Sequence, residues 1–167
     1  TFHAFCARVL RDYHAEWKQL RNSTMTKNFA IADDNACYRY IHGIIRERGF
    51  NSTEVATSRM QELIGLVKRE NLQERLVDNP ELQLACSVAK DYQQWLEDNN
   101  LMDFDDLVCI TRDLLVHHPQ TRERLRRKFR HVLVDEWQDT DKSQYLIVKL
   151  LGETAIQTAS PVQTATG

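Results

Sequence analysis

Two adjacent carboxylates, Asp135 and Glu136, are the residues whose type and position best suit chemistry in this chain. They directly follow the apolar run Val132–Val134, which predicts a short buried strand. In open α/β sheets, ligands bind at the carboxyl ends of the strands. An Asp-Glu pair there favours Mg²⁺-dependent phosphate chemistry, in which one carboxylate holds the ion through its water shell. The other carboxylate then orients a water for attack on a phosphate.

The same pair has a structural alternative, in which Asp135 and Glu136 end the strand and cap the next helix. Asp139, Thr140 and Asp141 can supply that cap without them. Two acids at the mouth of an apolar strand contribute little to stability. We therefore favour the phosphate-chemistry interpretation.

Most of the chain shows apolar residues at helical spacing, so we predict a mostly α-helical fold. The predicted helix starts are Thr1, Asp33 or Asp34, a capping box of Ser58 and Gln61, Asn79-Pro80, Asp103, and a point after Asp141. Pro119 should end the fifth helix, and a short basic helix follows it. The last helix, around 145–151, is almost wholly apolar, so we expect it to be buried against a sheet.

Composition places the chain among globular proteins, with 42% apolar and 28% charged residues. Its 167 residues suffice for one domain, or for one domain and a piece of another. The formal net charge of −2 does not indicate a nucleic-acid binder, although bases are concentrated at 122–130. That cluster could neutralise DNA phosphates, but a solvated helix face is the favoured interpretation. Trp17 and Trp95 could stack on bases, yet their positions on helix stripes favour core packing.

The four cysteines lack paired spacing, and Cys6, Cys37 and Cys86 fall on predicted apolar helix faces. They indicate small core residues in a reducing, intracellular compartment, whether cytoplasm, nucleoid, nucleus or organelle. The neighbours His117 and His118 point in different directions on a helix, so we do not expect a metal pair. No apolar run approaches the ~20 residues that span a membrane, and no membrane partner is expected.

Several features suggest a fragment. The chain begins with Thr1, and the predicted strand at Val132 has no second predicted strand to pair with. Residues 153–167 are rich in Thr, Ala and Gln without amphipathic spacing, so we expect a disordered tail.

Three separated blocks together resemble the superfamily-one DNA helicases of the UvrD/Rep/PcrA type. They are Thr1-Phe2-His3-Ala4-Phe5-Cys6 with Arg8 and Arg11, Leu101-Met102-Asp103-Phe104-Asp105-Asp106-Leu107, and Val134-Asp135-Glu136-Trp137-Gln138-Asp139-Thr140 with Gln144-Tyr145. The resemblance covers about residues 1–152. Within it, the strand and the Asp-Glu pair resemble a Walker B box.

The resemblance implies a helical insert subdomain and a partial RecA-like α/β core of the P-loop NTPase class, truncated at both ends. Residues 1–11 would belong to the ATP-binding core, 12–128 to the helical insert, and 129–152 to the return into the core. It also implies an ATP-dependent enzyme that moves along single-stranded DNA, with 3′ to 5′ polarity, and unwinds duplex at single-strand/double-strand junctions, as in DNA repair or replication.

By the same resemblance, Asp135 would hold Mg²⁺ and Glu136 would activate the hydrolytic water for ATP. Gln138 would couple the nucleotide state to the DNA. Thr1 and His3 would contact the DNA phosphates, with Phe2 between them. Without the family, Thr1 is simply an N-cap and His3 a surface histidine. Asp103, Asp105 and Asp106 are interpreted as first-turn acids facing the positive end of a helix.

The chain departs from the family in three places. Trp137 stands where the family usually has Phe or Tyr, the tail after Gly152 does not match, and Gly-x-x-x-x-Gly-Lys-Ser/Thr is absent. Without that loop, ATP phosphates lack their backbone cradle, so we predict that the isolated chain is inactive. A non-catalytic helical module that binds single-stranded DNA or protein, and an inactive truncated product, are the alternatives.

Overall fold

The protein, analysed as a computed structural model, is described for residues 1–50, 55–74 and 78–152. The elements are α1 (Phe2–Asp12), α2 (His14–Arg21), β1 (Ala30–Ile31), α3 (Asp34–Glu47), α4 (Thr57–Glu70), α5 (Pro80–Asp98), β2 (Leu101–Met102), α6 (Phe104–His117), α7 (Pro119–Lys128), η2 (Trp137–Asp139) and α8 (Lys142–Gly152). The predicted mostly helical fold is confirmed. The tail expected at 153–167 lies outside the described residues.

Most of the predicted helix starts are confirmed by side-chain caps. Thr1, Asp33, Asn79 and Asp103 each accept a hydrogen bond from the backbone amide three residues ahead. Such a bond satisfies one of the free amides of a first helical turn. Pro119 begins α7 after α6 has ended, as expected.

The predicted capping box of Ser58 and Gln61 is wrong, because α4 begins before Ser58. Ala56 is the N-cap and contributes no side-chain hydrogen bond. Thr57 is buried and pairs through its hydroxyl with His42 Nδ1 of α3 at 3.1 Å. Because this tertiary contact holds Thr57 in the first turn, α4 begins there and not at the position that the Ser58–Gln61 capping signal predicts.

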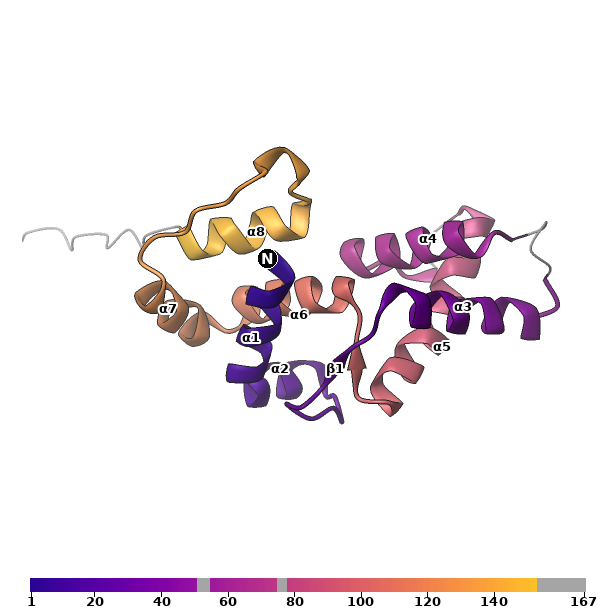
Figure 1. The fold of residues 1–167 in the computed structure, drawn as a ribbon, viewed down its shortest axis with the longest axis horizontal. Helices are drawn as coiled ribbons and strands as arrows, with labels where there is room; N and C mark the ends of the chain where they lie inside the picture. The colour runs from indigo at the N-terminus through magenta and orange to yellow at the C-terminus, as the bar shows by residue number, and fades with distance from the viewer. Residues whose placement is uncertain (51–54, 75–77, 153–167) are drawn as a thin grey trace, which may run out of the picture.

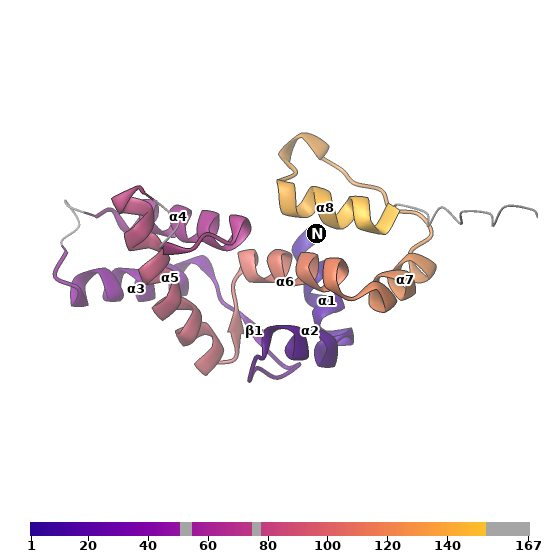
Figure 2. The same cartoon turned by 180° about the vertical axis from the view of Figure 1, so that it is seen from behind.

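Two separate hydrophobic cores divide the molecule into two lobes (Figures 1 and 2). The first lobe contains α1, α2, α6, α7 and α8, with Trp17, Leu107 and Leu114 fully buried in its core. The second contains α3, α4 and α5, with Ile41 and Leu96 buried at its centre. Each lobe buries its own apolar helix faces, and this burial is the main stabilising term for both.

A short parallel pairing forms the neck between the lobes. Ala30 pairs with Leu101 and Ile31 with Met102. Asn100 reinforces the pairing, because its side-chain oxygen accepts from the Thr26 amide at 2.7 Å. The sequence did not predict this sheet, since two residues per strand are too few to show an alternating pattern.

The predicted buried strand at Val132–Val134 is not present, and this is the main correction to the expected fold. Leu133 is 97% exposed, and the only sheet among the described residues is the β1–β2 pair. An apolar run becomes a strand only when a neighbouring strand satisfies its amides and carbonyls, and the described residues offer none. For the same reason α8 packs against α6 and α7 rather than against a sheet.

All four cysteines are free and buried. The core positions predicted for Cys6, Cys37 and Cys86 are confirmed, and Cys109 is buried as well. Burial raises the pKa of the Cys6 and Cys109 thiols to about 12, so both remain protonated and unreactive at neutral pH. Among the described helices, none is long and apolar enough to cross a bilayer.

Candidate functional site

The predicted site residues Asp135, Glu136 and Gln138 lie together in an exposed loop before α8. The Glu136 amide donates to Asp135 Oδ1 at 2.9 Å, and the Gln138 side-chain amide donates to Glu136 Oε2. Glu136 has a φ of 50°, in the left-handed region that residues other than glycine rarely adopt. The loop therefore fixes the Asp135 carboxylate on the Glu136 backbone and ties Gln138 to the Glu136 carboxylate.

Asp141, rather than Asp135 or Glu136, caps the following helix. Its Oδ1 accepts from the Gln144 amide at 2.8 Å, and Gln144 Oε1 accepts from the Asp141 amide at 3.3 Å. This reciprocal capping box satisfies the first turn of α8 without the two exposed acids. The structural alternative for Asp135 and Glu136 thus loses its main support.

The loop suits Mg²⁺ that is shared with a phosphate ligand. Mg²⁺ usually keeps several waters and binds through one or two carboxylates together with substrate phosphates, which the Asp135–Glu136 pair can match. No cluster of three or more potential metal ligands occurs among the described residues, so they form no cage made of protein ligands alone. The neighbouring Trp137 lies edge-on to Tyr145, with ring centroids 5.9 Å apart.

The predicted DNA-contacting residues lie at the start of α1, apart from this loop. Thr1 Oγ1 accepts from the Ala4 amide at 3.3 Å, and the His3 ring lies 4.8 Å from the Phe104 ring of α6. Phe2 is half-buried beside the first core. No hydrogen bond, ion pair or ring contact joins this group to the Asp135–Gln138 loop in the described chain. The two groups share α6 as their support, because α1 and α8 both pack on it.

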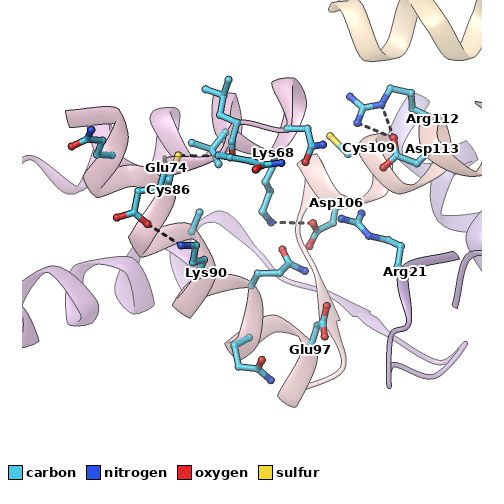
Figure 3. A pocket seen from close by; sticks show the side chains of 18 residues that line it. Arg21, Lys68, Glu74, Cys86, Lys90, Glu97, Asp106, Cys109, Arg112 and Asp113 are labelled. Atoms are coloured by element: carbon cyan, nitrogen blue, oxygen red, sulfur yellow. Dashed lines mark hydrogen bonds and ion pairs between the residues drawn. The ribbon is translucent and has the colours of Figure 1, made fainter. Parts of the chain in front are cut away.

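A buried ionic cluster that sequence reasoning missed connects the two lobes. Lys68 Nζ of α4 donates to Asp103 Oδ2 at 2.7 Å. It also donates to Asp106 Oδ1 at 3.0 Å (Figure 3). The ammonium also lies 4.8 Å from the centroid of the Tyr92 ring. Asp103 and Asp106 were predicted only as first-turn acids. The overlooked signal is that Lys68 falls four residues after Ile64, on the apolar stripe of its helix.

A cavity of about 920 Å³ opens beside this cluster, between α4, α5 and α6. Charged side chains of both signs line it, including Arg21, Lys90 and Arg112 (Figure 3). Asp106 Oδ2 is buried and accepts no hydrogen bond from the described residues. Burial, reinforced by the charge of Asp103, raises the pKa of the Asp106 carboxyl to about 6, against the opposing pull of Lys68.

The pKa of Asp106 predicts a pH-dependent stability. The folded state binds the Asp106 carboxyl proton more tightly than the unfolded chain does. Protonated Asp106 therefore stabilises the fold fully below about pH 4, and this stabilisation is lost as pH rises through about 6. Denaturant unfolding of wild type and Asp106→Asn between pH 4 and 7 measures it. We expect the stability of the wild type relative to the variant to fall across this range. If the stability of the wild type relative to Asp106→Asn rises with pH or stays constant, the raised pKa assigned to Asp106 is wrong.

Part of the basic cluster at 122–130 serves the fold. Arg122 Nη1 donates to the Leu115 carbonyl at 2.9 Å, and Arg126 Nε donates to the Leu150 carbonyl at 2.7 Å. Lys128 forms an ion pair with Asp12 at 3.2 Å. The favoured interpretation of a solvated face is therefore wrong for Arg122 and Arg126, whose half-buried side chains bind helix carbonyls.

Comparison with known proteins identifies relatives along almost the whole chain. Residues 1–159 match the family model described as UvrD/REP helicase N-terminal domain. The ATP-dependent DNA helicase PcrA of Bacillus subtilis is 32% identical over 157 residues, which is 92% of this chain and 20% of that protein. The ATP-dependent DNA helicase UvrD1 of Mycobacterium tuberculosis is 34% identical over 158 residues, or 90% of this chain and 20% of that protein. The chain thus spans about a fifth of the length of the curated relatives it matches.

Proposed function

We propose, since the chain belongs to the UvrD/REP helicase N-terminal domain family, that it is part of an ATP-dependent DNA helicase. The helicase would hydrolyse ATP to move 3′ to 5′ along single-stranded DNA and to separate the strands at a single-strand/double-strand junction. The observation that carries this proposal is the exposed Asp135–Glu136 pair, freed from capping by Asp141.

Each acid has its own role in the proposed reaction. Asp135 would hold Mg²⁺, which would supply positive charge against the phosphates of ATP. Glu136 accepts a proton from the attacking water and orients it, while the hydrogen bond from Gln138 holds the Glu136 carboxylate in place. Gln138 would couple the nucleotide state to the DNA, and its hydrogen bond to Glu136 supports this role.

The DNA contact is proposed for the start of α1. Thr1 and His3 would meet the phosphate backbone, with Phe2 between them. The free amides of the first helical turn and the positive end of the helix dipole favour a phosphate at this position. The second lobe would belong to the helical insert, predicted for residues 12–128, and α1 and the loop would belong to the RecA-like core.

The chain supplies only part of the ATP site. Its glycines are at 43, 49, 65, 152 and 167, so no Gly-x-x-x-x-Gly-Lys-Ser/Thr sequence is present to cradle the phosphates. We therefore expect the 167 residues alone to show no ATP turnover. ATP hydrolysis should therefore be measured in the full-length protein that contains these residues.

Glu136→Gln in the full-length protein is expected to lower DNA-stimulated ATP hydrolysis by about 10²–10⁴-fold, because a positioned general base contributes that much. Steady-state phosphate release with and without single-stranded DNA measures it. Glu62→Gln, at an exposed position on α4, is the matched control and should keep wild-type turnover. Undiminished hydrolysis in Glu136→Gln would refute the assigned role of Glu136.

A further inference from the structure

Arg112 of α6 contacts three parts of the structure at once. Its Nη1 donates to the Arg69 carbonyl at 2.7 Å and to Ser143 Oγ at 2.9 Å. Its Nε donates to Asp113 Oδ1 at 2.9 Å, which fixes the plane of the guanidinium. The side chain is only 15% exposed, so these contacts form largely away from water.

The two outer contacts lie at functionally different places. Arg69 is in the last turn of α4, in the second lobe, where a cation is favoured by the free carbonyls of a helix end. Ser143 is buried in the first turn of α8, directly after the carboxylate loop. Arg112 therefore joins the end of α4 in the second lobe to the helix that follows the loop carrying Asp135 and Glu136.

A weaker contact follows the same route. Lys142 Nζ, at the first residue of α8, donates to Glu70 Oε1 of α4 at 3.3 Å. Its side chain is 89% exposed, so solvent screens this pair and it contributes little. The largely buried, forked guanidinium of Arg112 is the stronger of the two links, because its nitrogens meet several acceptors in fixed geometry.

We propose that Arg112 is a positioning residue for ATP hydrolysis, which sets the orientation of the Asp135–Glu136 loop relative to the helical lobe. The proposal rests on the function proposed above. Within the described chain, Arg112 bonds to Arg69, Asp113 and Ser143 rather than to Asp135 or Glu136, so it would act by fixing the first turn of α8. A general base must hold its water in near-attack geometry, and small displacements of such a group are costly. Movement of the α4 end would thus reach Glu136 through Arg112 and Ser143.

The chain provides a matched control at the opposite end of α8. Arg126 is 14% exposed, and its Nε donates to the Leu150 carbonyl at 2.7 Å. Arg112→Ala and Arg126→Ala each remove a half-buried arginine contact to α8, so both should lower stability. Of these two arginines, Arg112 contacts the end of α8 that follows the carboxylate loop, and Arg126 contacts the other end.

The test is steady-state ATP hydrolysis by the full-length protein, below the unfolding temperature of every variant. We expect Arg112→Ala to lower kcat about 10-fold with KM changed less than about twofold, since positioning of the base is lost while nucleotide binding remains. Ser143→Ala, which removes only the α8 partner, should lower kcat in the same direction by a smaller factor. Arg126→Ala should keep wild-type kcat.

Hydrogen exchange of the peptide covering 139–147 gives a readout independent of ATP. Arg112→Ala and Ser143→Ala should speed exchange there, while Arg126→Ala leaves it unchanged. Wild-type kcat in Arg112→Ala, or an equal fall in Arg126→Ala, would overturn the proposal. If Glu136→Gln retains turnover, the proposed role of Glu136 fails. If Glu136→Gln is inactive and Arg112→Ala is not impaired, the positioning role alone fails.

Discussion

Lys68→Ala is expected to lower the free energy of unfolding by about 3–5 kcal/mol, the usual result of removing one partner from a buried ion pair. Lys68 lies between Asp103 and Asp106, at 2.7 and 3.0 Å, and all three side chains are largely shielded from water. Without the ammonium, two neighbouring carboxylates remain buried with no opposite charge between them. Urea denaturation followed by circular dichroism measures the loss.

Two further variants distinguish the buried pairing from a general effect of losing a lysine. Lys142→Ala removes an exposed ion pair with Glu70 and should cost less than about 1 kcal/mol. Combining Lys68→Met with Asp103→Asn and Asp106→Asn removes all three charges, keeps a capping side chain at 103, and should recover most of the stability. A loss below about 1 kcal/mol in Lys68→Ala would show that this cluster does not hold the lobes together.

Trp17→Ala is expected to cost about 3–5 kcal/mol, because it empties a large space in the first core. Trp17 is fully buried, and its Nε1 donates to the Leu10 carbonyl at 2.7 Å. The ring also meets His14 edge-on, with centroids 5.2 Å apart. The same urea titration measures the effect, and the slope against denaturant should stay unchanged if the rest of the fold persists.

Trp137→Ala is the control for Trp17. Its ring is on a residue that is 49% exposed, so the stability change should stay within about 0.5 kcal/mol. If the two substitutions cost the same, the core position assigned to Trp17 is wrong. Trp17→Phe should lie between them, because it keeps part of the ring volume and loses the indole donor.

Local signals in the sequence predicted the helices well, because caps and apolar stripes act over a few residues. Asp33, Asn79 and Asp103 illustrate this, since each cap is decided by the amide three residues ahead. The buried positions of Trp17 and Cys37 followed from helical spacing in the same way. The family resemblance, confirmed by the family match, came from three blocks rather than from periodicity.

Features that depend on distant partners could not be predicted. The apolar run at Val132 resembled a strand, but strand pairing needs a neighbour that the described chain lacks. The β1–β2 pair brings Ala30 beside Leu101, and two residues carry no alternation to detect. For the candidate site, the sequence singled out Asp135 and Glu136 after an apolar run, while the contacts of Arg112 with Arg69 and Ser143 emerge only in three dimensions. The site roles themselves stay predictions until the variants are measured.

The neck has a consequence for how such proteins diversify. Because β1 and β2 pair side by side, the chain leaves the first lobe and returns to it within about one strand spacing of 4.8 Å. The helices α3, α4 and α5 are thus an insertion attached through two adjacent strands. The length of this insertion can change without opening the first core. Their orientation relative to the first lobe depends instead on the contacts that Lys68 and Arg112 make between α4 and α6. Different residues therefore determine how the second lobe is attached and how it is oriented. Substitutions can alter its orientation while the β1–β2 attachment is preserved.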